Sequence, residues 1–532
     1  MFDVIVSGGE VYDGDGKPGF AADIGISGAQ IAAIGDLAGA ECGERIDARG
    51  RAVAPGFIDI HTHSDFTLLV DGSADSQLCQ GVTSEVIGQC GFSCAPIRPS
   101  VARDALVGFH DAGVEIDWTS FGQYLDRLDQ AGLGVNVAAL VGHGSIHRAV
   151  KGEDNRALDA GDVDAMVRLA DAALEEGAFG LSTGLEYWPG NAAPPEAIEA
   201  MVGAAARKNA LYATHVRNRD VYYDLGFTEA IAYARHAGAR LQISHIQPKF
   251  GAPKHAMADT FELLARAARE DVDVAFDVIP HDWNHTFAVA ALPGWAREGG
   301  TARTLARLGD AGLRDRLKNN PTPIWRVIPA RRWDIVRLLV SKANPHLVGL
   351  TFAEIGRQRG VDPHDALLDL LREEGEDMAQ MMMTSQSFSD ADICMCMRHA
   401  DCSVMSDTMA LSPRGALKNT VGSLSGYGWT ARLLGHYVRE RGVLTLAEGI
   451  NRITGRPADR IGLADRGRLR VGAQADIVVF DPATIAARGT FAEPKAHPVG
   501  IDAVLVNGVL AVRGGRRTDA RTGRVLRRKT SG

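Results

Sequence analysis

The alternation of hydrophobic and polar residues changes character twice along the chain. In the first 50 residues, short apolar segments alternate with glycine-containing pairs such as Gly8-Gly9 and Asp13-Gly14, a pattern typical of antiparallel strands joined by tight turns. From residue 53 short apolar segments alternate with stretches of helical periodicity, and after residue 460 the strand pattern returns. We therefore expect β structure at both ends of the chain and an α/β unit between them.

The central α/β pattern contains eight predicted strands. They are Val53–Ile60, Ser84–Gly88, Val135–Val141, Gly180–Ser182, Leu211–Thr214, Leu241–Ser244, Val272–Val278 and Cys402–Met405. Between several of them lie predicted helices with acidic starts or a following glycine, namely Asp162–Glu176, Glu196–Lys208, Thr228–His236 and Met257–Glu270. Strands that alternate with helices favour parallel pairing. A closed (β/α)8 TIM barrel is the simplest fold in which eight such strands pair in this way.

These patterns divide the chain into three parts. Residues 1–55 and 461–532 are expected to combine into one small β-sandwich domain, and residues 56–460 to form the barrel. The stretch 281–401, between the seventh and eighth strands, is too long for an ordinary connection and indicates an ordered insertion covering one face, as a lid or a structural elaboration. The basic tail from Arg513 to Gly532 is expected to fray.

The composition and charge of the chain limit the kinds of molecule that it is expected to bind. The chain has 532 residues, of which 45% are hydrophobic and 23% charged, as is ordinary for a soluble globular protein with a large core. A net charge of −9 and a pI near 6.0 argue against nucleic acid or an anionic membrane, because such partners require a basic face. No apolar run reaches ~18 residues, and the first ten residues lack a secretory signal. A small-molecule partner is the remaining expectation, and the sequence does not indicate an oligomeric state.

The seven cysteines are odd in number and scattered, so they do not form a disulfide framework. A reducing cytoplasm is therefore the expected compartment. Six of them are interpreted as buried apolar residues: Cys42, Cys79, Cys94, Cys394, Cys396 and Cys402.

The stretch from Pro55 to Asp65 ends an apolar strand with two histidines one residue apart. Side chains at i and i+2 of a strand point to the same side, so His61 and His63 would present their imidazoles together, with Asp59 below them. Imidazole is a common zinc ligand. A strand that merely enters a polar turn explains this pair equally well, so the other strand ends decide between the two readings.

In a (β/α)8 barrel the chemistry lies at the carboxyl ends of the strands. These ends carry Cys90 after the second strand, His143 after the third, Glu186 and Tyr187 after the fourth, His215 after the fifth, His245 after the sixth and Asp407 after the eighth. Taken singly, each histidine could be a core residue, the cysteine a buried apolar residue and the aspartate a turn cap. Taken together with His61 and His63 at one rim, they indicate a metal site.

These motifs resemble those of the N-acyl-D-amino-acid deacylase (D-aminoacylase) family of the amidohydrolase superfamily. The resemblance covers nearly the whole chain and rests on Pro55-Gly56-Phe57-Ile58-Asp59-Ile60-His61-Thr62-His63, Gly88–Ser93, Gly142-His143-Gly144, Ser182–Tyr187, Thr214–Asn218, Ser244-His245 and Ser406-Asp407. In that family a cysteine replaces the carboxylated lysine that bridges two metals elsewhere in the superfamily. The resemblance implies that Cys90, His215 and His245 hold one Zn²⁺ tightly. It also implies a second site, weaker or vacant, formed by His61, His63 and Asp407.

Such a zinc ion has chemistry of its own. Zn²⁺ held by one thiolate and two imidazoles keeps an open position, polarises a carbonyl and lowers the pKa of bound water toward ~7. Asp407 is the candidate general base and acid, taking a proton from water and passing it to a departing amine. His143 and Tyr187 are candidates for hydrogen bonding to the oxyanion or the substrate.

Two positions depart from the family pattern. Relatives have a second histidine and a lysine directly after the sixth-strand histidine and Tyr-Pro-Tyr after the seventh strand, whereas this chain has Ile246-Gln247 and Ile279-Pro280-His281. In the family these positions help hold the α-carboxylate of the substrate, so Lys249 and Arg217 become candidates for that task, with a solvated charge as the alternative for each. His281 is a further candidate for substrate binding. We predict hydrolysis of a linear amide, either an N-acyl-D-amino acid or a relative with an altered amine portion.

Three alternatives compete with this prediction. A cyclic amide or lactone hydrolase of the same superfamily is the alternative enzyme, although Gly180-Leu181-Ser182-Thr183 lacks the bridging lysine of hydantoinase-like sites. A deaminase is disfavoured because no His-x-x-Glu motif follows the fifth or sixth strand. A non-catalytic barrel that acts as a binding protein would be expected to have lost ligands, and none is lost.

Overall fold

An eight-stranded parallel sheet forms the centre of the computed structural model, which describes residues 1–99, 113–152, 156–319, 326–420, 423–491 and 493–529. The strands pair in the order β6-β7-β8-β9-β10-β11-β12-β16. Their bounds are β6 Phe57–Asp59, β7 Val82–Ile87, β8 Asn136–Gly142, β9 Gly180–Gly184, β10 Leu211–His215, β11 Arg240–Ile243, β12 Val274–Val278 and β16 Cys402–Val404. The α/β barrel prediction is confirmed, with all eight predicted strands present.

The barrel closes where its first and last strands end. Thr62, after β6, forms a parallel bridge with Thr408, after β16. The His63 amide donates to the Thr408 carbonyl at 2.7 Å, and the Asp407 amide donates to the His61 carbonyl at 3.1 Å. The residues of the predicted metal site therefore also form the seam of the barrel.

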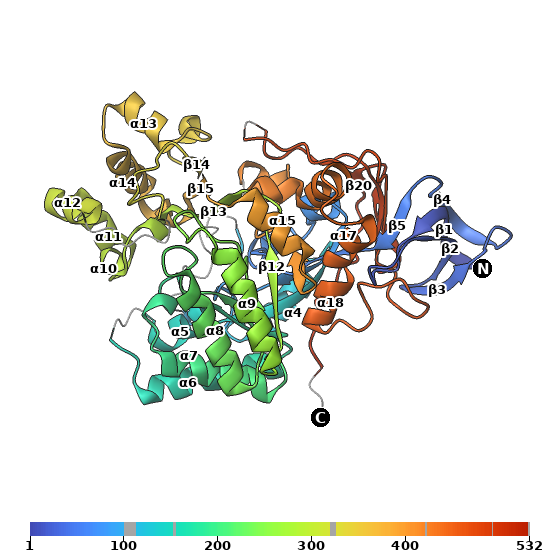
Figure 1. Cartoon of the computed structure of the whole chain (residues 1–532), viewed down its shortest axis with the longest axis horizontal. Helices are drawn as coiled ribbons and strands as arrows, with labels where there is room; N and C mark the ends of the chain where they lie inside the picture. The colour runs from blue at the N-terminus through green and yellow to red at the C-terminus, as the bar shows by residue number, and fades with distance from the viewer. Residues whose placement is uncertain (100–112, 153–155, 320–325, 421–422, 492, 530–532) are drawn as a thin grey trace.

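Helices surround the barrel, as Figure 1 shows for α6, α7, α8 and α9. Their bounds are Ala160–Glu175, Pro195–Arg207, Tyr223–Ala237 and Ala256–Arg269, which matches the four predicted helices with earlier starts. Asp159 explains the start of α6, because its side chain accepts from the Asp162 amide in a capping box. The other helices around the barrel are α1 Thr67–Val70, α2 Asp75–Leu78, α4 Phe121–Gln130, α5 His143–Lys151, α15 Asp390–Arg398, α16 Trp429–Ala431, α17 Leu446–Arg452 and α18 Gly455–Ile461. Among the described residues, no helix combines the length and apolarity needed to cross a bilayer.

The strand predicted at Val53–Ile60 is in fact two strands that belong to different sheets. β5 (Ala52–Pro55) pairs with strands of the terminal sheet, and β6 begins the barrel after Gly56. A side chain at Gly56 would collide with Thr83 of β7, so only glycine allows the chain to pass from one sheet to the other here.

Both chain ends contribute to one nine-stranded sheet with the order β20-β19-β18-β17-β5-β1-β2-β3, in which β4 also pairs with β1. Its strands are β1 Phe2–Val11, β2 Phe20–Ser27, β3 Gln30–Gly35, β4 Cys42–Asp47, β17 Ile477–Phe480, β18 Ile501–Val506, β19 Val509–Arg513 and β20 Arg516–Arg517. The sheet encloses its own apolar core, in which Val6 and Ile24 meet Ile477 and Leu505. The predicted turn at Gly8-Gly9 was wrong, because β1 runs through the pair with a bulge that shifts its register.

The basic tail does not fray in its described part, contrary to the sequence prediction; residues 530–532 lie outside the described residues. Its backbone amides donate to the barrel, from Gly523 to Leu133 at 2.9 Å and from Leu526 to Val137 at 2.7 Å. The tail is basic in composition, but Arg521 donates to the Gly132 carbonyl and Arg527 pairs with Asp126, so part of its charge is bonded to the elements around the barrel.

The insertion between β12 and β16 carries its own sheet, in the order β13-β15-β14. These strands are β13 Trp283–Phe287, β14 Val336–Val340 and β15 Met382–Gln386, and the helices are α10 Gly294–Arg297, α11 Gly300–Gly309, α12 Ala311–Asn319, α13 Phe352–Arg359 and α14 Pro363–Glu374. A separate apolar core that includes Met381 and Met383 holds it together. In Figure 1 the insertion, in yellow tones, and strands β1–β4, in blue, lie at opposite ends of the molecule.

Candidate metal centre

Six predicted ligands come together at the carboxyl end of the barrel. His61 and His63 follow β6, Cys90 follows β7, His215 ends β10, His245 follows β11 and Asp407 follows β16. Parallel strands of a barrel end at the same rim, which is why residues far apart in sequence meet there.

Cys90 lies at the middle of the first cluster. Its Sγ is 3.4 Å from His61 Nε2, 3.4 Å from His245 Nε2 and 3.7 Å from His215 Nδ1. His215 Nδ1 and His245 Nε2 are themselves 3.0 Å apart. One sulfur and several ring nitrogens pointing at a common space form a donor set that suits zinc.

Asp407 forms a second cluster beside the first. Its Oδ1 lies 3.4 Å from His61 Nε2 and 3.3 Å from His63 Nε2. His61 faces both clusters. Together the two clusters offer ligands for one ion or for two neighbouring ions.

The charge state of these groups suits a cation. Burial raises the pKa of the Cys90 thiol, but the positive charge of His61 and hydrogen bonds from His215 and His61 outweigh it and hold the pKa well below its ordinary value. Burial also raises the pKa of Asp407, while His63 and His61 lower it to a net value below its usual range. The thiolate and the carboxylate are therefore the favoured forms.

Backbone strain concentrates at the same residues. Cys90, His245 and Asp407 have φ angles of 53°, 33° and 50°, in the left-handed region that residues other than glycine seldom adopt. Such conformations persist only where the surrounding structure enforces them, and they occur most often at functional sites.

Three buried carboxylates orient the histidines and the strand ends. Asp59 accepts from the Ser406 amide at 3.1 Å and thereby ties β6 to the end of β16. Asp277 of β12 accepts from the His245 amide at 2.6 Å, with an oxygen 3.7 Å from His61 Nδ1. The sequence reasoning missed Asp277, although an acidic residue inside an otherwise apolar strand could have revealed it.

Glu186 is the third of these carboxylates. His215 Nε2 and Glu186 Oε2 are 2.6 Å apart, and Lys249 Nζ pairs with Glu186 Oε1. Holding Nε2 in this way turns Nδ1 of His215 toward Cys90, as carboxylates next to metal-binding histidines commonly do. The predicted substrate residue Lys249 is thus engaged inside the protein.

The other predicted substrate residues differ in the contacts that their side chains make. Tyr187 packs edge-on against His215, with ring centroids 4.6 Å apart. His143 is fully buried, and neither of its ring nitrogens has a hydrogen-bond partner among the described residues. Arg217 is neutralised by a bidentate pair with Glu229 and donates to the Asn191 carbonyl.

His281 follows β12, and His285 lies on β13 of the insertion. His281 is buried, and its Nε2 has no hydrogen-bond partner in the described part of the chain. His285, on β13, lies close enough to Asp407 for the carboxylate to oppose the burial that lowers the pKa of the imidazole. His285 was not predicted, because nothing in the local sequence shows that β13 folds back to the rim.

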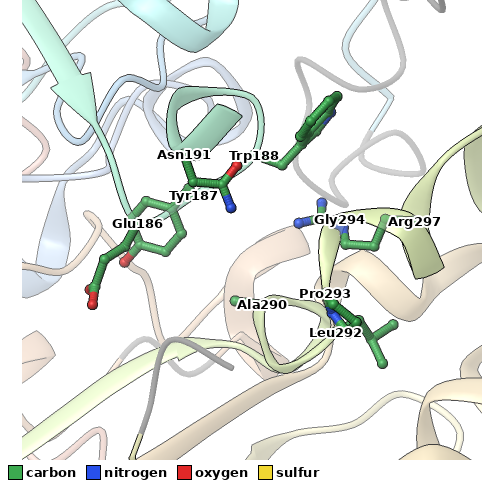
Figure 2. A pocket seen from close by; sticks show the side chains of 9 residues that line it. All are labelled: Glu186, Tyr187, Trp188, Asn191, Ala290, Leu292, Pro293, Gly294 and Arg297. Carbon is green, nitrogen blue, oxygen red and sulfur yellow. The ribbon is translucent and has the colours of Figure 1, made fainter. Parts of the chain in front are cut away.

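A pocket of about 100 Å³ adjoins the centre between the loop after β9 and the insertion. Figure 2 shows Glu186 and Tyr187 on one side and Leu292, Pro293 and Arg297 on the other. Because Glu186 lines the pocket and also contacts His215, the pocket lies beside the clustered ligands. The arrangement provides a place for a small molecule beside a cation site.

Comparisons with known proteins agree with this architecture. A model described as the amidohydrolase family matches residues 44–512. The chain is 34% identical to the N-acyl-D-glutamate deacylase of Alcaligenes xylosoxydans xylosoxydans over 99% of this chain and 97% of the relative.

Solved structures are similar over the same length. A crystal structure of N-acyl-D-glutamate deacylase from Bordetella bronchiseptica, complexed with zinc and a phosphonate mimic of the tetrahedral intermediate, matches with a TM-score of 0.83 and 30% identity, covering 99% of this chain and 100% of that one. A D-aminoacylase structure described by its binuclear metal center, with one-metal activation and second-metal attenuation, matches with the same values. With the family model matching most of its length, this chain belongs to the amidohydrolase family.

Proposed function

We propose that this protein is a zinc-dependent hydrolase of a linear amide, an N-acyl-D-amino acid or a related N-acyl amide. The observation that carries the proposal is the convergence of Cys90, His215 and His245 beside His61, His63 and Asp407. The deacylase relatives, similar over nearly the whole chain, support the substrate class.

The residues fit the metal without rearrangement of the fold. Cys90, His215 and His245 would hold the tight ion, and His61, His63 and Asp407 would hold the weaker one. When bound, zinc would polarise the scissile carbonyl and acidify water beside it. The second-metal attenuation described for the D-aminoacylase relative is in keeping with one tight and one weaker site.

Asp407 is the proposed proton carrier. Its pKa is held low, so the carboxylate is ionised at neutral pH and can take a proton on Oδ from the attacking water. The same oxygen then returns the proton to the amine nitrogen as the amide bond breaks. Asp407 lies at the rim, 9% exposed, between the buried histidines and the open side of the site.

Buried polar groups without partners are the proposed contacts for the substrate. His143 and His281 both carry such ring nitrogens, and burial lowers the pKa of each, so the neutral imidazoles can donate or accept a hydrogen bond. Tyr187 borders both His215 and the pocket. Since Lys249 and Arg217 are already paired with carboxylates, an amine portion that differs from a plain amino acid is favoured.

We further propose a cytoplasmic location. All seven cysteines are free, as expected in a reducing compartment.

Elemental analysis of the purified protein, combined with a screen of N-acyl-D-amino acids, N-acyl-L-amino acids and amides without a carboxylate, tests the function. Tightly bound zinc with turnover in the D series supports the proposal in its narrow form. Turnover only of carboxylate-free amides would support the altered amine portion. A protein without zinc or amidase activity would contradict the proposal.

A further inference from the structure

A second group of metal-ligating side chains lies outside the centre and shares no residue with it. Asp75 opens α2 and Cys79 caps its end, so both side chains project from one helical turn in which the Cys79 amide donates to the Asp75 carbonyl at 3.1 Å. His497 comes from the segment between β17 and β18. The ligand atoms of all three residues lie within 4.8 Å of one another.

The geometry of this cluster is that of a ligand set. Asp75 Oδ1 is 3.0 Å from His497 Nε2, yet it accepts no well-aligned hydrogen bond from the described residues. Asp75 and Cys79 are only 4% and 3% exposed. A buried carboxylate oxygen without a donor costs free energy unless a cation or water satisfies it.

Two more buried polar atoms adjoin the same space without partners in the described chain. They are Nδ1 of His497 and the hydroxyl of Tyr427, whose ring centroid is 5.1 Å from that of His497. Together with the Asp75 oxygen, these atoms leave unsatisfied polar groups around the place where the three side chains meet.

We propose that Asp75, Cys79 and His497 bind a zinc ion at a structural site separate from the catalytic centre. Carboxylate, thiolate and imidazole together are a donor set that zinc accepts, and the one-third exposure of the His497 side chain leaves an open side for entry and for a fourth ligand. The interpretation of Cys79 as a buried apolar residue therefore changes, because its side chain lies among polar groups.

The position of the site explains what the ion would do. α2 leads directly into β7, which carries Cys90 at its other end. Ser76 of α2 exchanges two hydrogen bonds with Leu411, from its amide to the Leu411 carbonyl at 3.0 Å and from the Leu411 amide to its hydroxyl at 2.9 Å. Zinc here would fasten the segment before β18 to the elements that support two catalytic strand ends, and would act on stability rather than on turnover.

Zinc content of the full-length protein tests the proposal. Cys79→Ser and His497→Asn should each lose one zinc equivalent per chain relative to the wild type while keeping amidase activity. The matched controls are Cys94→Ser, at an equally buried cysteine, and His399→Asn, whose side chain is 31% exposed against 33% for His497. Equal zinc content in the wild type and the two test variants would overturn the proposal.

Cobalt spectroscopy separates this site from the centre. In a Cys90→Ala background the catalytic thiolate is gone, so cobalt–thiolate charge-transfer absorption after Co²⁺ addition should come from Cys79 and disappear in Cys90→Ala/Cys79→Ser. Absorption that is absent in the single variant would overturn the proposal and leave only an ion pair between Asp75 and His497. Absorption that persists in the double variant would also overturn it, because the thiolate would then belong to another cysteine.

Discussion

Replacing Glu186 by glutamine tests how the centre is held together. Burial raises the pKa of Glu186, but the charge of Lys249 and the hydrogen bond from His215 outweigh it and lower the pKa from 4.5 to about 2. A shift of that size corresponds to about 3 kcal/mol of stability at neutral pH. Glutamine keeps the shape of the side chain and removes the charge, leaving the Lys249 ammonium buried without its counter-ion.

The pH dependence follows from the direction of this shift. Because the folded-state pKa lies below the unfolded one, the contribution of Glu186 is fully present above pH 4.5 and is lost as the pH falls through 2. The difference between wild type and Glu186→Gln should therefore be about 3 kcal/mol at pH 7 and about half of that near pH 3.

Denaturant unfolding of the metal-free proteins at several pH values measures this difference. Zinc titration of the same variant should show an affinity about 10 to 100 times weaker, because His215 loses the carboxylate that orients it. Glu229→Gln is the matched control: its pair with Arg217 is partly exposed, so a loss below about 1 kcal/mol is expected. A loss for Glu186→Gln that does not change with pH, or that equals the control, would refute the reasoning.

Three further predictions address the ligands, the proton carrier and the tail. Cys90→Ala should lose the tight zinc and activity but stay folded, whereas Cys396→Ala, at another buried cysteine, should keep both; full zinc in Cys90→Ala by elemental analysis would remove it from the ligand set. Asp407→Asn should retain the tight metal but lower kcat by about 100-fold or more, and undiminished turnover would exclude Asp407 from proton transfer. Truncation after Arg517 removes the backbone bonds of Gly523 and Leu526 to the barrel and should lower the melting temperature by several degrees with activity retained. An unchanged melting temperature would mean that the tail does not stabilise the barrel.

The sequence predicts the barrel, and it predicts that the candidate ligands lie together at its rim, because both depend on local pattern. Apolar segments mark the strands, and polar residues directly after them mark the rim, so His215 and His245 fall where β10 and β11 end. Local pattern also explains why one strand is predicted around Gly56 where the structure has two. The hydrophobic residues continue across the glycine although the chain passes from one sheet to the other there.

Long-range pairing is what the sequence could not supply. The sequence offers Lys249 and Arg217 as candidate substrate contacts but gives no sign of their carboxylate partners, Glu186 and Glu229, which the fold alone brings to them. The prediction that the tail frays is wrong because it rests on side-chain charge. The tail instead binds Leu133 and Val137 through its backbone amides.

The closure of the barrel at its metal-binding rim has a consequence for how the protein acquires its metal during synthesis. Ser406 donates to Asp59 across a separation of 347 residues, and Asp407 follows Ser406. The second ligand set, His61, His63 and Asp407, is therefore complete only after most of the chain has emerged and the last barrel strand has docked. Contacts this distant in sequence form late and slowly. A nascent chain carrying only the first strands offers at most His61, His63 and Cys90, so binding of an ion at the second ligand set would stabilise the fully assembled barrel over its incomplete forms.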